Sequence, residues 1–163
     1  ESIRAVYCNN RMYKNKGDAM SKQQQMQDIL KDTVDYYNVD PANRRCVTDD
    51  GDCMYTWGKN HCAVGRFLKD EYINDENWSY NNNMAVLELE EYADSKCIDE
   101  FLVDSVHGLE SNFWARLQDI HDTVGYWEEF HEHIDGRRKY GLTDRGKEEY
   151  AKFQDQIGEG YYD

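Results

Sequence analysis

The chain lacks several features that would point to a membrane or to a common enzyme class. It has one proline in 163 residues and no apolar run near the ~18 residues that a membrane-spanning helix needs. It contains no Walker loop, no G-x-G-x-x-G, no H-E-x-x-H and no G-x-S-x-G. Disorder is excluded because 13 Tyr, 4 Trp and 5 Phe are too many aromatics for a disordered chain. We expect a single domain over residues 1–163, with residues 1–20 as an extended arm.

Basic residues are nearly absent from the middle of the chain. Residues 70–135 contain 18 Asp or Glu against only Lys96 and Arg116, a net charge of −16. The other 97 residues contain 15 acidic and 17 basic residues, and the whole chain carries −14. Such a field repels phosphate backbones and attracts basic surfaces. We expect the partner to be a basic protein surface, with no direct binding to nucleic acid or to a membrane. The alternative is that the acidic residues bind no partner and form solvated helix faces that keep a small domain soluble.

Hydrophobic spacing predicts an α+β domain that is predominantly α-helical. Apolar positions at helical intervals favour helices over 21–38, 84–92, 98–106 and 143–157. The first should present Met26, Ile29, Leu30, Val34 and Tyr37 on one face, and Thr143 should cap the last. A short helix is also expected over Cys62–Leu68. The longest pattern predicts a central helix over about 111–135, through Phe113, Leu117, Ile120, Val124, Trp127, His131 and Ile134. Two β-prone runs around a glycine turn predict one small β-hairpin over about 45–57, packed on this helical bundle.

The stretch Cys53–Leu68 concentrates residues that could carry chemistry. Cys62 follows a glycine-bearing turn near a helix N-terminus, where the helix dipole lowers a thiol pKa. His121, or His61, is the candidate base for a nucleophilic Cys62. Asp122 is not expected to orient His121, because adjacent helical residues point about 100° apart. No catalytic residue is therefore assigned.

The cysteines also raise the question of a metal. Soft ligands are available in Cys46, Cys53, His61 and Cys62, but Cys53-x8-Cys62 is too wide for one zinc knuckle and no second ligand pair follows. No metal and no cofactor are expected, and the cysteines are interpreted as small buried residues. Five cysteines, an odd number, favour a reducing compartment.

The acidic segment supplies the predicted contact surface. Its aromatic and acidic candidates for partner binding are Trp78, Tyr80, Glu88, Glu90, Glu91, Asp94, Glu128 and Glu129. A competing pattern is Leu142-Thr143-Asp144-Arg145-Gly146, which is typical of wing-to-helix junctions in winged-helix DNA-binding proteins. A match over five residues does not outweigh the net negative charge of the chain, which opposes DNA binding.

Two motifs resemble a known family. The first runs Cys53-x-Tyr55, Gly58, Cys62-Ala63-Val64-Gly65-x-x-Leu68 and Glu71-Tyr72; the second is Leu117-Gln118-Asp119-Ile120-His121-Asp122, followed by Trp127. Together, over roughly residues 36–142, they resemble a family of small uncharacterised proteins common in phage and bacterial genomes. The resemblance implies a phage or bacterial accessory protein but does not imply a particular activity.

The function expected from these observations is non-enzymatic. We expect an acidic phage-type accessory protein in the host cytoplasm or the virion, acting through protein–protein interaction. It would be an inhibitor or nucleic-acid mimic against a host factor, such as a defence factor, or a virion component. The alternatives are a small Cys/His hydrolase or small-ligand binder centred on Cys62, and a structural zinc-binding module.

Overall fold

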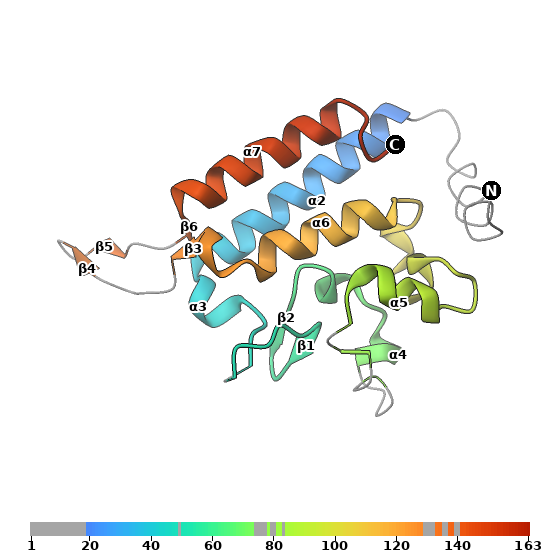
Figure 1. The fold of residues 1–163 in the computed structure, drawn as a ribbon, viewed down its shortest axis with the longest axis horizontal. Helices are drawn as coiled ribbons and strands as arrows, with labels where there is room; N and C mark the ends of the chain where they lie inside the picture. The colour runs from blue at the N-terminus through green and yellow to red at the C-terminus, as the bar shows by residue number, and fades with distance from the viewer. Residues whose placement is uncertain are drawn as a thin grey trace.

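The fold is predominantly helical α+β, as the spacing predicts. The computed structural model describes residues 19–48, 50–73, 78, 81–82, 84–128, 133–134, 137–138 and 141–163, so residues 1–18 of the expected arm lie outside it. The three longest helices are α2 (Ala19–Val39), α6 (Ser111–Asp122) and α7 (Asp144–Gly158), and they pack against one another (Figure 1). Helix α5 (Val86–Tyr92) packs on α6. None of the described helices combines the length and apolar character needed to cross a bilayer.

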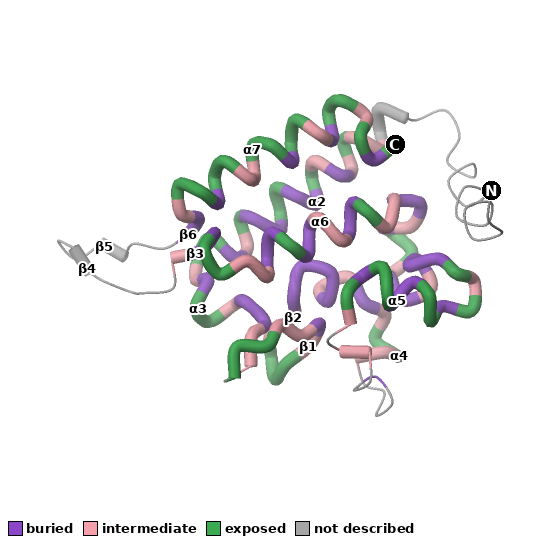
Figure 2. The backbone as a smooth tube through the Cα atoms, in the orientation of Figure 1, coloured by how far each residue is buried: buried purple, intermediate pink, exposed green. Residues whose placement is uncertain are grey.

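The core lies between these helices. All the residues on the predicted apolar face of α2 are buried, namely Met26, Ile29, Leu30, Val34 and Tyr37. Helix α6 contributes Phe113 and α7 contributes Phe153, whose ring centroids lie 5.6 Å apart. Figure 2 shows the buried sides of the helices facing one another and the exposed sides facing outward. Burial of each large apolar side chain contributes about 1.5–3 kcal/mol, which makes this packing the main source of stability.

Helix α6 ends at Asp122, so the helix expected to continue to about 135 is wrong. The last carbonyls of a helix have no partner within it. Here Thr123 Oγ1 donates to the Asp119 carbonyl at 2.7 Å and Trp127 Nε1 donates to the Ile120 carbonyl at 2.8 Å. Arg45 Nε donates to the His121 carbonyl at 2.8 Å, which also places a cation at the helix C-terminus. These donors terminate the helix although the apolar spacing continues.

Short strands follow α6 instead. After a 3₁₀ turn, η5 (Val124–Tyr126), β3 (Trp127–Glu128) pairs antiparallel with β6 (Gly141–Leu142), and between them β4 (His133–Ile134) pairs with β5 (Arg137–Arg138). Val124, predicted to lie in the apolar seam, is 64% exposed, and His131 falls outside the described part.

Helix α7 begins as predicted. Thr143 caps it, with its Oγ1 accepting from the Gly146 backbone N–H at 3.1 Å. The run Leu142–Gly146 is therefore a strand-to-helix junction. This local geometry is compatible with the winged-helix pattern.

We call residues 45–68 the latch segment. A short helix, α3 (Pro41–Arg44), leads into it. Within the expected 45–57 hairpin, Val47 and Cys53 form an isolated antiparallel bridge. The two-stranded ladder lies further on, where β1 (Thr56–Trp57) pairs with β2 (Asn60–His61). A 3₁₀ turn, η1 (Gly65–Phe67), then replaces the expected helix.

The remaining elements are short. Helix α4 (Asp70–Ile73) follows the latch segment. The helix expected over 98–106 is two 3₁₀ turns, η3 (Ile98–Phe101) and η4 (Asp104–Val106), because Leu102 between them forms a bridge with Leu68. Pairing of these two backbones, distant in the sequence, overrides the local helical spacing.

Candidate functional site

His121 lies where the latch segment meets α6. Its side chain is fully buried, and its ring packs edge-on against Tyr37 of α2 with centroids 4.9 Å apart. The Cys46 backbone N–H donates to His121 Nε2 at 3.0 Å. On the other side of the ring, Nδ1 lies 2.7 Å from Asp122 Oδ1. Both ring nitrogens therefore have partners.

These two contacts determine the protonation state of the ring. Because Cys46 donates to Nε2, that nitrogen must carry its lone pair, and the proton of the neutral imidazole sits on Nδ1 and is donated to Asp122. Burial lowers the pKa of His121, and the hydrogen bond to Asp122 opposes part of that effect. The resting side chain is thus a neutral, fully hydrogen-bonded imidazole.

The expectation that Asp122 cannot orient His121 is wrong. Asp122 is the last residue of α6, and the chain turns to extended backbone at Thr123, so its carboxylate can reach the neighbouring ring. Gln118 Nε2 donates to the same Oδ1 at 2.7 Å and holds it in place. The side-chain oxygen Oε1 of Gln118 accepts in turn from the Val64 backbone N–H at 3.2 Å. One hydrogen-bonded network therefore joins α6 to two points of the latch segment.

A catalytic role for His121 does not fit this network. A general base needs a free lone pair within reach of a substrate proton. The only lone pair on the ring points at the Cys46 N–H, and the side chain has no exposed surface. The His–Asp pair has the composition of a catalytic dyad but is used to attach the latch segment to α6.

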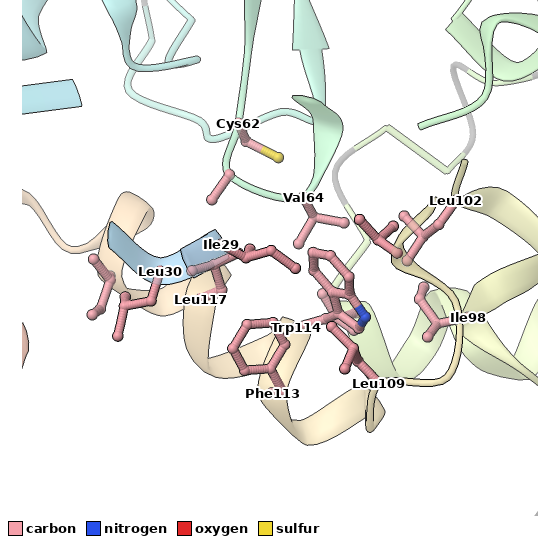
Figure 3. Close-up of a cluster of buried hydrophobic side chains, with 14 of the residues drawn as sticks. Ile29, Leu30, Cys62, Val64, Ile98, Leu102, Leu109, Phe113, Trp114 and Leu117 are labelled. Atoms are coloured by element: carbon pink, nitrogen blue, oxygen red, sulfur yellow. The ribbon is translucent and has the colours of Figure 1, made fainter. Parts of the chain in front are cut away.

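Burial favours the protonated form of the three free thiols that the structure describes, Cys46, Cys53 and Cys62. Cys62 is fully buried beside Val64 and the apolar side chains of the helices (Figure 3), and its Sγ accepts from the Gly65 backbone N–H at 3.1 Å. Burial raises the pKa of Cys62 well above its ordinary value, opposite to the lowering that a helix N-terminus would produce. Burial also raises the pKa of Cys46 and of Cys53 to about 12.

The predicted zinc ligands do not converge as a set. Within the described ranges, the metal-type donors that do converge belong to Cys53, His121 and Asp122, with ligand atoms within 4.8 Å of one another. A metal on Nδ1 of His121 would move the ring proton to Nε2, where it would face the Cys46 N–H donor. Metal-bound histidines normally donate from their second nitrogen. The arrangement fits a hydrogen-bonded structural site better than a metal site.

Cys97 differs from the other described cysteines. It is disulfide-bonded, whereas Cys46, Cys53 and Cys62 are free. Disulfides are rare where thiols are kept reduced. The disulfide therefore does not fit the expected reducing compartment.

The predicted partner-binding residues separate into buried and exposed groups. Trp78 is only 4% exposed, because its ring packs against Tyr55, Tyr72 and Phe101 at centroid distances of 5.7–5.8 Å. Glu90 is also buried, at 2% exposed. Neither can form part of a contact surface, so both assignments are wrong.

The other acidic candidates lie in different places. Glu88, Glu91 and Asp94 are exposed on or directly after α5, whereas Glu128 is half-buried in β3. Tyr80 and Glu129 fall outside the residues whose structure is described.

Helix α5 presents a mixed acidic and apolar surface. Its inward side buries Val86 and Leu89 against the core. Its outward side exposes carboxylates together with Leu87 at 44% and Tyr92 at 67%. We call the set Leu87, Glu88, Glu91, Tyr92 and Asp94 the α5 face.

Comparison of the chain with protein-family models, with curated proteins and with solved structures finds no match. The function must therefore be argued from the site itself.

Sequence reasoning missed three parts of this arrangement. The hydrogen bond of Arg45 to the C-terminus of α6, the link from Gln118 of α6 to the latch segment, and the exposure of Leu87 and Tyr92 were not predicted. A usable signal existed for α5. In a helix over 84–92, Val86, Leu89 and Ala93 fall on one side, which leaves Leu87 and Tyr92 on the other side, where large apolar side chains stand out.

Proposed function

We propose that the protein is a non-enzymatic, acidic accessory protein of the phage type that binds a basic protein surface through the α5 face. One observation carries the proposal: α5 exposes Leu87 and Tyr92 among the carboxylates of Glu88, Glu91 and Asp94. Aromatic residues are enriched at interfaces, while surrounding charges steer a partner of opposite sign.

The target class follows from the charge. A segment with a net charge of −16 competes with nucleic acid for the basic surfaces of nucleic-acid-binding proteins. A host nucleic-acid enzyme or defence factor is one target of this chemistry, and a basic component of the virion is another. The sequence resemblance to small phage and bacterial proteins supports the phage assignment.

Charge reversal at two sites tests the proposal. The test variant carries Glu88→Lys, Glu91→Lys and Asp94→Lys. The matched control carries Glu148→Lys, Asp155→Lys and Glu159→Lys, which change exposed residues in or next to α7 by the same total charge. Each protein is used to capture partners from a bacterial host lysate at low and at high salt.

The comparison separates a local surface from net charge. We expect one basic protein to be retained at low salt by the wild type and by the α7 control, and to be lost with the α5 variant. Retention should weaken at high salt, because exposed charges are screened. Equal loss with both variants, or capture that ignores salt, would contradict the proposal.

A further inference from the structure

Arg66 shows how this chain holds a guanidinium on a helix surface. Its Nη2 donates to Asp32 Oδ2 at 2.8 Å, and its Cζ lies 4.3 Å from the centroid of the Tyr36 ring. Asp32 and Tyr36 are four residues apart on α2, so their side chains are neighbours on one face of the helix. The carboxylate provides a charge-assisted hydrogen bond, and the ring provides a cation–π contact. Arg44 Cζ also lies 4.5 Å from the Tyr36 centroid.

Helix α5 carries the same kind of pair with the same spacing. Glu88 precedes Tyr92 by four residues, as Asp32 precedes Tyr36. Both members are exposed, and the Tyr92 residue is 67% exposed. Among the residues that the structure describes, no cation lies over the Tyr92 ring and no ion pair involves Glu88. The pair on α5 is therefore available to a cation from outside the chain.

We infer that Glu88 and Tyr92 form a binding position for an arginine side chain of a protein partner. The inference rests on the proposed function, since it specifies which basic residue the α5 face recognises. Glu88 would accept from the guanidinium while the Tyr92 ring stacks on its plane, as Asp32 and Tyr36 do with Arg66.

Arginine fits this position better than lysine. The guanidinium is planar and weakly hydrated, so one group can stack on a ring and donate to a carboxylate at the same time. The lysine ammonium is a compact, strongly hydrated charge that loses more hydration on contact with a ring. Glu91 and Asp94 attract either cation and do not discriminate between them.

Two peptides of equal length and equal charge test the inference, one with arginines and one with lysines on the same Gly/Ser background. Binding of each labelled peptide to the full chain is measured by fluorescence anisotropy. We expect the arginine peptide to bind more tightly. Tyr92→Ala should weaken the arginine peptide by about two- to five-fold, the effect of one exposed cation–π contact, and should leave the lysine peptide nearly unchanged.

The chain supplies a matched control in Tyr161, which is 70% exposed and far from α5 in the sequence. Tyr161→Ala should leave the affinity for both peptides unchanged. Glu88→Gln should weaken the arginine peptide and reduce its advantage over lysine. Circular dichroism of each variant verifies that the fold is retained.

The outcomes also separate this inference from the proposed function. Equal affinity for both peptides, unaffected by Tyr92→Ala, would overturn arginine selection while leaving a basic partner in place. Peptide binding that survives the triple charge reversal of the α5 face would overturn both.

Discussion

Replacement of His121 tests whether the densest group of chemical residues in the chain is structural. His121→Ala removes the acceptor of the Cys46 backbone N–H and the donor to Asp122. A buried N–H left without an acceptor costs about 1–3 kcal/mol. Loss of the ring that packs on Tyr37 leaves a cavity, and large-to-small core replacements cost about 2–5 kcal/mol.

The expected loss is therefore about 3–8 kcal/mol, against a total stability of about 5–15 kcal/mol for a domain. Urea unfolding followed by tryptophan fluorescence and by circular dichroism gives the free energy of unfolding of each variant. A large decrease in the urea midpoint of His121→Ala, with no change in the slope, is the predicted result.

Two further variants separate the hydrogen bonds of the ring. In His121→Gln the side-chain oxygen can replace Nε2 as acceptor for Cys46, whereas in His121→Asn the amide can replace only the Nδ1 donor. We expect His121→Gln to recover about 1–3 kcal/mol relative to His121→Ala, and His121→Asn to recover less. If His121→Ala lies within about 1 kcal/mol of the wild type, the ring does not hold the latch segment and the structural interpretation is refuted.

Three other predictions concern the same region. Burial lowers the pKa of His121 in the folded state below its unfolded value, so at acidic pH the unfolded chain binds one more proton than the folded chain. The free energy of unfolding should therefore decrease as the pH drops below about 6.5, by up to about 1.4 kcal/mol per pH unit. This contribution to the pH dependence should vanish in His121→Gln. Unfolding at several pH values measures it, and an unchanged slope would contradict the assignment. The Cys62 thiol should react with a disulfide reagent only as fast as the protein unfolds; rapid modification of the native protein, mapped to Cys62 by mass spectrometry, would be the opposite result. Gly65→Ala should strongly destabilise the fold, because the added Cβ would lie 2.0 Å from the Tyr55 carbonyl oxygen. The Cβ of Gly158→Ala meets no atom within 4 Å, so that variant should be neutral or stabilising. Similar unfolding midpoints for the two variants would exclude tight packing at Gly65.

The sequence was sufficient where local pattern and final packing agree. The apolar face of α2 and the Thr143 cap of α7 follow from residues within each helix, and both predictions are confirmed. The end of α6 could not be found this way. Its last carbonyls accept from Arg45 and Trp127, one of which comes from a segment far back in the chain.

The candidate site shows the same division. The sequence correctly indicated that Glu88 and Glu91 lie exposed on a helix, but the polar residues around Trp78 wrongly indicated an exposed contact residue. Trp78 is buried because aromatic rings from three separate segments surround it, and no local pattern encodes that convergence. The pairing of His121 with Asp122 was missed because ideal helix angles do not hold at the final residue of a helix.

The most direct test of where this protein works is an NMR titration of the isotopically labelled chain with the arginine peptide. Backbone amide shifts report which residues meet the ligand. We expect the shifts to concentrate over residues 86–94, on α5 and directly after it. Shifts that concentrate instead around Cys62 and His121 would contradict it, because they would return the working site to the segment assigned here as structural.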